Sequence, residues 1–218
     1  MPDKKRIFLV DDHPLVREWL ANLINQEEDL MVCGSAPNAP EALAAIQAME
    51  PDAAVIDIAL ERGSGLELLK NVKVCCPRVT MLVLSMHEES AYAERALRAG
   101  ARGYLTKRET TQKVITAIRQ VLAGKLYISE AFAAAMAERI FEGGGSGVAG
   151  EELSDRELQV FELLGAGQET WRIAESLNIS MKTVQTYCLR IKEKLHLSNA
   201  SELIREAVRW QDRKQGGV

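Results

Sequence analysis

The N-terminal part of the chain carries five polar residues that together could accept a phosphoryl group. Each of them follows or ends a short apolar segment of the kind that forms a buried strand. They are the adjacent acids Asp11 and Asp12, a third acid Asp57, the hydroxyl residue Ser85 and the amine residue Lys107. Converging carboxylates repel one another unless a cation lies between them, and carboxylate oxygens are ligands that Mg2+ prefers. We therefore expect the three acids to form a Mg2+ site.

The same residues suit phosphoryl transfer to a carboxylate. The charge of an incoming phosphoryl group must be neutralised by a metal ion and a cation, and Lys107 can supply the cation. Ser85 can donate a hydrogen bond to a phosphoryl oxygen. Asp57 is the expected nucleophile, because carboxylates can form acyl phosphates. Taken singly, each residue has a simpler explanation, such as a loop-capping acid or a solvated lysine, so the interpretation depends on the whole set.

The elements that would position these residues alternate along the chain. Strands are predicted at 6–10, 30–35, 53–58, 79–85 and 103–105, and helices at 14–24, 40–49, 65–74, 90–99 and 111–123. Thr110 or Thr111 is expected to cap the last of these helices. Such alternation predicts an α/β fold, with a doubly wound parallel sheet covered by helices on both faces. Its working crevice should lie at the carboxyl ends of the strands, where the polar residues fall.

A glycine-rich stretch at 142–150, in which five of nine residues are glycine, predicts a linker. We expect one domain over 1–125, a helix at 129–141 and linker within 126–150, and an all-α domain over 151–218. The net charge of −4 provides no protein-wide basic field, so nucleic-acid binding would need a local patch. The N-terminus has no signal pattern and no apolar run approaches a membrane span, which predicts a cytoplasmic protein without membrane contact.

Other potential metal ligands are given a structural interpretation. His13 follows the acids but lies at the start of a predicted helix, so a role at the helix entry is favoured over metal ligation. The four cysteines, Cys33, Cys75, Cys76 and Cys188, form no C-x-x-C pair. Reduced thiols are therefore favoured over a zinc site.

Four segments resemble the receiver domains of two-component response regulators. They are VDDHP at 10–14, VIDIAL at 55–60, VLSMHEE at 83–89 and ARGYLTK at 101–107. The resemblance implies a flavodoxin-like (βα)5 fold, Mg2+ held by Asp12 and Asp57 with help from Asp11, and phosphotransfer from a histidine kinase to Asp57. It also implies that Ser85 and Tyr104 form a switch.

One departure from the receiver pattern follows the phosphoacceptor. Many relatives have a Met-Pro-Gly turn where this chain reads Ala59-Leu60-Glu61-Arg62-Gly63. The backbone carbonyl of Ala59 is still available to the metal. The stiffness of the loop and the lifetime of the phosphoryl group are left open.

The C-terminal region predicts a helix-turn-helix. Ser154 stands three residues before Glu157, which is a capping-box pattern at the start of a helix. Two further helices are expected at 170–177 and 181–195, joined by a tight turn and with Ser180 as the cap of the second. On a helical wheel, Val184, Cys188, Ile191 and Leu195 of this second helix face the core.

The opposite face of that helix could bind DNA. Residues 180–194 include four basic residues and one acid, a local balance of +3. The candidates for phosphate contact are Ser180, Lys182, Thr183, Arg190 and Lys194. Gln185 could read an adenine edge, and Thr186 or Leu189 could touch a thymine methyl group. The alternative is that these charges only solvate an exposed helix.

Residues 153–207 resemble LuxR-type DNA-binding domains, through LSDRELQVFELLGAG, RIAESLNIS, KTVQTY and KLHL. Together with the receiver motifs they resemble the NarL/FixJ group of response regulators. That resemblance implies a four-helix domain and a homodimer on promoter DNA formed through the last helix, about 201–211, with a receiver contact left open. Trp171 and Arg172 stand where relatives often have Lys and Glu, and Tyr187 where His is frequent. We expect Trp171 in the core rather than at a phosphate, and the operator sequence is left open.

Two other functions were weighed against a phosphorylation-controlled transcription regulator. A phosphohydrolase with an aspartate nucleophile would need a second acid two residues after it, and that position is Ala59. The protein is therefore not expected to be an enzyme, beyond phosphotransfer to itself and its own dephosphorylation. The C-terminal helices could instead bind another protein, which salt-dependent DNA binding would distinguish.

Overall fold

The computed structural model describes residues 4–109, 111–141 and 153–215. The chain divides into two compact units, Met1–Glu138 and Arg139–Val218. The predicted linker at 142–150 and the predicted cap Thr110 lie outside the described residues, so the domain boundaries 1–125, 126–150 and 151–218 stay a prediction. Within the described ranges, no helix combines the length and the apolar character needed to cross a membrane.

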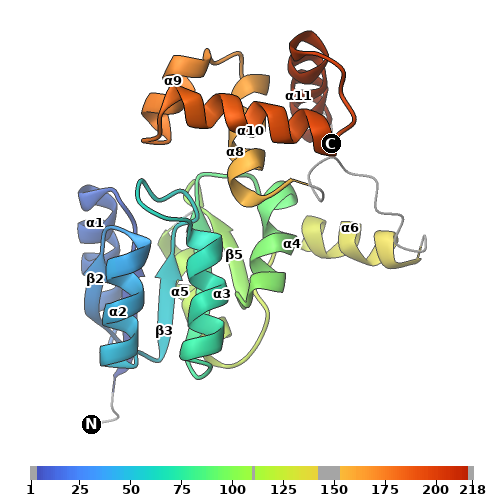
Figure 1. Cartoon of the computed structure of the whole chain (residues 1–218). Helices are drawn as coiled ribbons and strands as arrows, with labels where there is room; N and C mark the ends of the chain where they lie inside the picture. Colours follow the sequence, from blue (N-terminus) through green and yellow to red (C-terminus); the bar gives the residue numbers. More distant parts are fainter. Residues whose placement is uncertain (1–3, 110, 142–152, 216–218) are drawn as a thin grey trace. The chain divides into compact units, whose positions relative to one another are not determined.

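The first unit is a parallel sheet of five strands in the order β2-β1-β3-β4-β5 (Figure 1). The strands are β1 Lys5–Val10, β2 Leu30–Ala36, β3 Ala53–Ile56, β4 Thr80–Ser85 and β5 Gly103–Thr106. Between and after them run α1 Pro14–Asn25, α2 Ala39–Met49, α3 Gly65–Cys75, α4 Glu89–Ala99 and α5 Thr111–Leu122. The predicted alternation and the doubly wound fold are confirmed.

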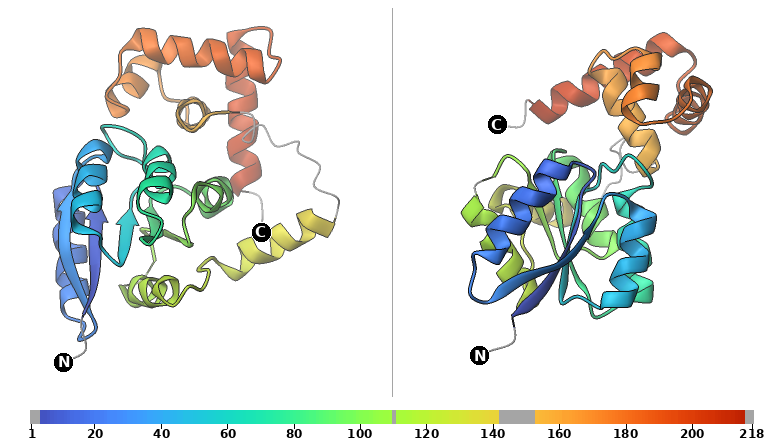
Figure 2. Two further views of the ribbon diagram at one scale, coloured as in Figure 1. Left: turned by 60° about the horizontal axis from the view of Figure 1, so that its bottom comes forward. Right: turned by 90° about the vertical axis from the view of Figure 1, so that its left-hand side faces the viewer.

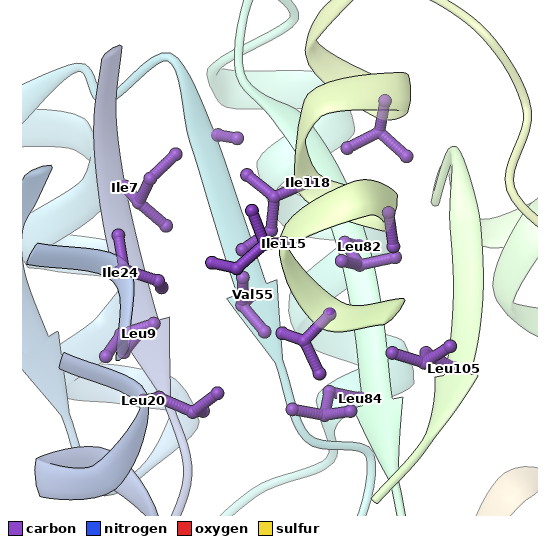
Figure 3. Close-up of a cluster of buried hydrophobic side chains, with 14 of the residues drawn as sticks. Ile7, Leu9, Leu20, Ile24, Val55, Leu82, Leu84, Leu105, Ile115 and Ile118 are labelled. Atoms are coloured by element: carbon purple, nitrogen blue, oxygen red, sulfur yellow. The ribbon is translucent and has the colours of Figure 1, made fainter. Parts of the chain in front are cut away.

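Helices cover both faces of this sheet (Figure 2). A buried cluster joins the sheet to α1 and α5, with side chains from all five strands meeting those of the two helices (Figure 3). Its labelled members include Leu9 and Leu82 from the strands, Ile24 from α1 and Ile118 from α5. α2, α3 and α4 pack against one another in sequence on the other side. The central strands β3 and β4 are buried on both faces, which is why they read as continuous apolar runs, whereas the edge strand β2 is only partly buried.

Local signals set where the helices begin. Asn38 caps α2 by accepting from the Glu41 N–H at 3.0 Å, and Ser64 caps α3 by accepting from the Glu67 N–H at 3.4 Å. The strand predicted at 53–58 ends earlier, at Ile56, so Asp57 lies in the loop beyond the sheet.

α6, Glu130–Phe141, lies mostly in the first unit, which ends at Glu138, and was predicted one residue longer at its start. The second unit contains α8 Asp155–Gly165, α9 Thr170–Ser176, α10 Met181–Lys194 and α11 Ala200–Gln215. The capping box predicted for α8 is present, with Ser154 and Glu157 each accepting from the other's backbone N–H. The Phe161 ring of α8 packs 6.4 Å from the Trp210 ring of α11, between centroids. The last helix is longer than the predicted 201–211.

Gly65 lets α3 start directly against the phosphoacceptor loop. A Cβ atom at this position would lie 2.2 Å from the Asp57 carbonyl oxygen and 2.6 Å from the Ile58 Cα. Both are backbone atoms, so a larger residue can fit only if the loop or the helix moves. This contact therefore helps to fix the position of Asp57.

We predict that Gly65→Ala lowers the free energy of unfolding by about 1–3 kcal/mol, the usual cost of overpacking a tight contact. Urea unfolding followed by circular dichroism measures the change. Asn71→Ala, on an exposed position of the same helix, is the control and should change stability by less than about 0.5 kcal/mol. An equal effect of the two substitutions would contradict the close-contact argument.

Candidate functional site

The parallel register brings Asp11 and Asp57 side by side. Val10 pairs with Ile56 across β1 and β3, and the residue directly after each strand is the acid. The Asp57 N–H donates to the Val10 carbonyl at 2.8 Å. Lys107 follows β5, and its N–H donates to the Ser85 carbonyl at 2.8 Å. Residues that are far apart in the sequence thus meet at one end of the sheet.

Lys107 binds two carboxylates at once. Its Nζ lies 2.5 Å from Asp11 Oδ2 and 2.5 Å from Asp57 Oδ2. The side chains of Asp11, Asp57 and Lys107 are 3%, 2% and 10% exposed. Burial raises the pKa of Asp57, and the attraction of Lys107 offsets this only in part. Burial alone would lower the pKa of Lys107, but the two carboxylates raise it overall. The ammonium is therefore held in its charged form.

Asp12 is the third acid, and one of its carboxylate oxygens makes no hydrogen bond. Its Oδ2 accepts from the Glu61 N–H at 3.2 Å, while its Oδ1 is buried and without a hydrogen bond. His13 Nδ1 lies 2.5 Å from this Oδ1, in a geometry that is not a hydrogen bond. Ligand atoms of Asp11, Asp12 and His13 lie within 4.8 Å of one another. This acidic pocket could hold a divalent cation.

His13 itself is the N-cap residue of α1, as its predicted role at the helix entry requires. Its side chain is 69% exposed and makes no capping hydrogen bond. Its backbone N–H donates to Asp11 Oδ1 at 2.9 Å, which helps to orient that carboxylate.

Hydrogen bonds hold the loop that replaces Met-Pro-Gly. Asp57 Oδ1 accepts from the Ala59 N–H at 3.0 Å, and the Ala39 N–H donates to the Arg62 carbonyl at 3.2 Å. Leu60 is buried, so the loop has an apolar anchor although it lacks proline. The loop is thus attached to Asp57, to Asp12 through Glu61, and to the start of α2.

The two predicted switch residues meet at His87, which the sequence did not single out. Ser85 is fully buried at the end of β4, and its Oγ accepts from the His87 N–H at 3.3 Å. Tyr104 is also buried, and its hydroxyl donates to the His87 carbonyl at 3.0 Å. Because His87 contributes backbone groups here, its side-chain type gave no signal.

In the second unit, α10 presents the predicted outer face. Ser180 caps the helix by accepting from the Thr183 N–H at 3.1 Å, and the two hydroxyls are 2.8 Å apart. Val184 and Ile191 are buried, while Cys188 and Leu195 are half-buried. The positions predicted to face outward are exposed: Lys182, Gln185, Thr186, Leu189, Arg190 and Glu193.

The expectation for Trp171 was wrong. This side chain is 48% exposed rather than part of the core. Its Nε1 donates to the Glu169 carboxylate, and the guanidinium of Arg172 lies 5.1 Å from the ring centroid. α9 has seven residues, and its buried positions are Ile173 and Ala174, so Trp171 lies on the exposed side of this short helix.

Lys194 differs from the other predicted phosphate contacts. Its Nζ lies 2.7 Å from Glu157 Oε2, and that carboxylate is only 3% exposed. Burial alone would raise the pKa of Glu157, but Lys194 and the Ser154 hydrogen bonds lower it overall. The ammonium therefore neutralises a buried acid of the capping box, and its DNA contact stays a prediction.

Comparison with known proteins decides the family. Residues 7–119 match the response regulator receiver domain, and residues 151–207 match the LuxR family of bacterial regulatory proteins. The transcriptional activator ExaE of Pseudomonas putida is 36% identical over 203 residues, covering 93% of this chain and 95% of ExaE. The response regulator GacA of Pseudomonas viridiflava is 34% identical over 204 residues, covering 94% and 95%. The chain is a response regulator.

A solved structure agrees with this response regulator in fold. RcsB of Salmonella enterica serovar Typhimurium, bound to promoter rprA in the presence of the phosphomimetic BeF3−, has a TM-score of 0.62. It is 22% identical, and the match covers 93% of this chain and 98% of RcsB. The NarL/FixJ resemblance is confirmed, and the family consists of DNA-binding transcription regulators rather than classical enzymes.

We predict that Lys194→Met destabilises the second unit of the response regulator by about 1–2 kcal/mol at neutral pH, because Glu157 would remain buried without its cation. The folded-state pKa of Glu157 lies below its ordinary value of 4.5, so the pair stabilises the fold above that pH. Its contribution is lost as the pH falls through the folded-state pKa.

Urea unfolding of wild type and Lys194→Met across this pH range measures both effects. The difference between the two proteins should shrink toward low pH. Lys182→Met, which removes an exposed cation from the same helix, is the control and should have little effect on stability. A difference that stays constant with pH would show that Glu157 is not the partner that matters.

Proposed function

We propose that Asp57 accepts a phosphoryl group from a histidine kinase and that this controls binding of the second unit to promoter DNA. The observation that carries the proposal is the bridge from the Lys107 ammonium to Asp11 and Asp57, buried at the end of the sheet. In the transfer, a carboxylate oxygen of Asp57 bonds to phosphorus while the phosphorus–nitrogen bond of the donor histidine breaks. Lys107 then faces the new phosphoryl oxygens.

The acidic pocket supports Mg2+ as the cation of this site. Asp12 and Asp57 would hold the ion, with Asp11 assisting. Asp12 Oδ1 is buried and lacks a hydrogen bond, so it has an unused lone pair for a ligand. When bound, Mg2+ would neutralise phosphoryl oxygens during the transfer. The Glu61 N–H meanwhile keeps Asp12 in place.

Ser85 and Tyr104 would act as the switch. The Ser85 hydroxyl would turn to the phosphoryl group, and Tyr104 would move with the backbone of His87, to which its hydroxyl donates. The phosphoryl group would thus shift an existing equilibrium between two arrangements of this loop.

The exposed face of α10 would read DNA. The phosphates would be contacted by Ser180, Lys182, Thr183 and Arg190, and also by Lys194, whose ammonium is shared with Glu157. The bases would be contacted by Gln185, Thr186 and Leu189. The Thr186 hydroxyl donates to the Lys182 carbonyl at 2.9 Å, which leaves the Thr186 methyl group available for a thymine.

The homodimer would form through α11. This helix exposes Ile204 and Val208, as expected of a helix that packs against the same helix of a second copy of the chain.

We predict that Asp57→Asn abolishes phosphorylation by acetyl phosphate, because an amide cannot form the acyl phosphate. Beryllofluoride with Mg2+ should strengthen promoter binding by the wild type and leave the variant unchanged. Fluorescence anisotropy with labelled promoter fragments measures the affinity. A variant that still responds to beryllofluoride would contradict the assignment of Asp57.

We predict different effects for two substitutions on α10. Lys182→Met should weaken binding to all sequences alike and reduce the slope of log affinity against log salt by about 1. Gln185→Ala should cost about 1–3 kcal/mol on the preferred site and relax specificity at one base pair. Titrations at several salt concentrations, on specific and random DNA, separate the two effects. A salt slope unaltered by Lys182→Met would show that this lysine does not contact phosphate.

A further inference from the structure

α6 lacks the residue that would complete its own N-terminal cap. Ser129 precedes the helix, and its Oγ accepts from the Phe132 N–H at 3.1 Å. In a full capping box, a Glu or Gln at the third helical position also accepts from the N–H of the cap residue. α8 has this arrangement, since Glu157 accepts from the Ser154 N–H at 2.7 Å. In α6 the same position is the buried, apolar Phe132.

Glu89 supplies the missing acceptor from a different helix. Its Oε1 accepts from the Ser129 N–H at 2.9 Å, although the two residues are 40 positions apart. Glu89 is the first residue of α4. We propose that Glu89 is a positioning residue that completes a split capping box, so that the first turn of α6 depends on where α4 begins.

The segment before α6 is also attached beside the switch tyrosine. The Tyr127 N–H donates to the Arg102 carbonyl at 3.0 Å, and the Tyr104 N–H donates to the Tyr127 carbonyl at 2.9 Å. This segment therefore continues the sheet at the edge formed by β5. The start of α6 is thus connected to β5 through the backbone of Tyr104 and to α4 through the side chain of Glu89.

The start of α4 is in turn connected to Ser85. The intervening residue His87 donates its N–H to Ser85 Oγ at 3.3 Å, and its ring stacks on Tyr92 of α4, with centroids 4.5 Å apart. If the Ser85 hydroxyl turns to a phosphoryl group on Asp57, the His87 N–H loses this acceptor. The loop then moves and carries Glu89 away from Ser129.

Phosphorylation thus weakens the cap of α6, the helix in which the first unit ends and the second unit begins along the chain. This link to the phosphoryl site rests on the proposed function. The split cap itself does not, because its hydrogen bonds join only Glu89, Ser129 and Phe132 and do not involve Asp57.

Hydrogen exchange at the backbone amides of residues 129–133 in the full chain tests the split cap. Glu89→Ala should speed their exchange by about 5-fold, the factor expected for loss of one ordinary hydrogen bond. Glu89→Gln keeps an acceptor oxygen and should give a smaller increase. Glu88→Ala is the matched control, because Glu88 makes no capping bond and pairs with the exposed Arg108 at 2.9 Å. It should leave the exchange of these amides unchanged.

The same measurement with beryllofluoride and Mg2+ tests the link to the phosphoryl site. Exchange in the wild type should rise toward that of Glu89→Ala, and Glu89→Ala should show no further rise. Equal exchange in the wild type and Glu89→Ala without beryllofluoride would overturn the split cap. A beryllofluoride response of the same size in both proteins would overturn its coupling to Asp57. Failure of the proposed function would be seen separately, because beryllofluoride and Mg2+ would then leave hydrogen exchange at the backbone amides of residues 57–63 unchanged.

Discussion

One ammonium group shared between two buried carboxylates is the interaction on which the receiver depends. Lys107 contacts Asp11 and Asp57 equally closely, and Asp12 lies beside them with its Oδ1 atom without a hydrogen bond. Three carboxylates against one ammonium leave the ionised cluster two positive charges short. A buried excess of negative charge is costly unless a cation joins it. The cluster is therefore suited to a divalent ion and to a group that brings further oxygens to Lys107.

The sheet could be predicted because its strands require particular side-chain types, which the sequence shows directly. Strands buried on both faces must be apolar, and parallel pairing forces their ends to one edge, so the positions of Asp57 and Lys107 followed from spacing alone. The contacts that orient the site could not be predicted in this way. The Glu61 N–H on Asp12 and the His87 carbonyl that accepts from Tyr104 are backbone groups, which any residue type would supply.

In the second unit, periodicity correctly separated the buried and exposed faces of α10, but it does not reveal which partner a single residue contacts. The expected phosphate contact of Lys194 stays a prediction, and in this structure its ammonium also neutralises Glu157, an acid whose burial no local pattern revealed. Trp171 was expected inside, but Ile173 and Ala174 form the buried side of α9, and a carboxylate and a guanidinium contact the indole at the surface. Both outcomes depend on tertiary neighbours rather than on helical spacing.

The charge imbalance around Lys107 can be tested by titrating Mg2+ into the full chain by calorimetry, comparing the wild type with Lys107→Met. If the carboxylates are short of positive charge, removing the ammonium must make Mg2+ bind more tightly, by about 10-fold or more for a competing unit charge at this distance. Equal or weaker Mg2+ binding by Lys107→Met would contradict the account, because the lysine and the metal would then not share the same negative charge.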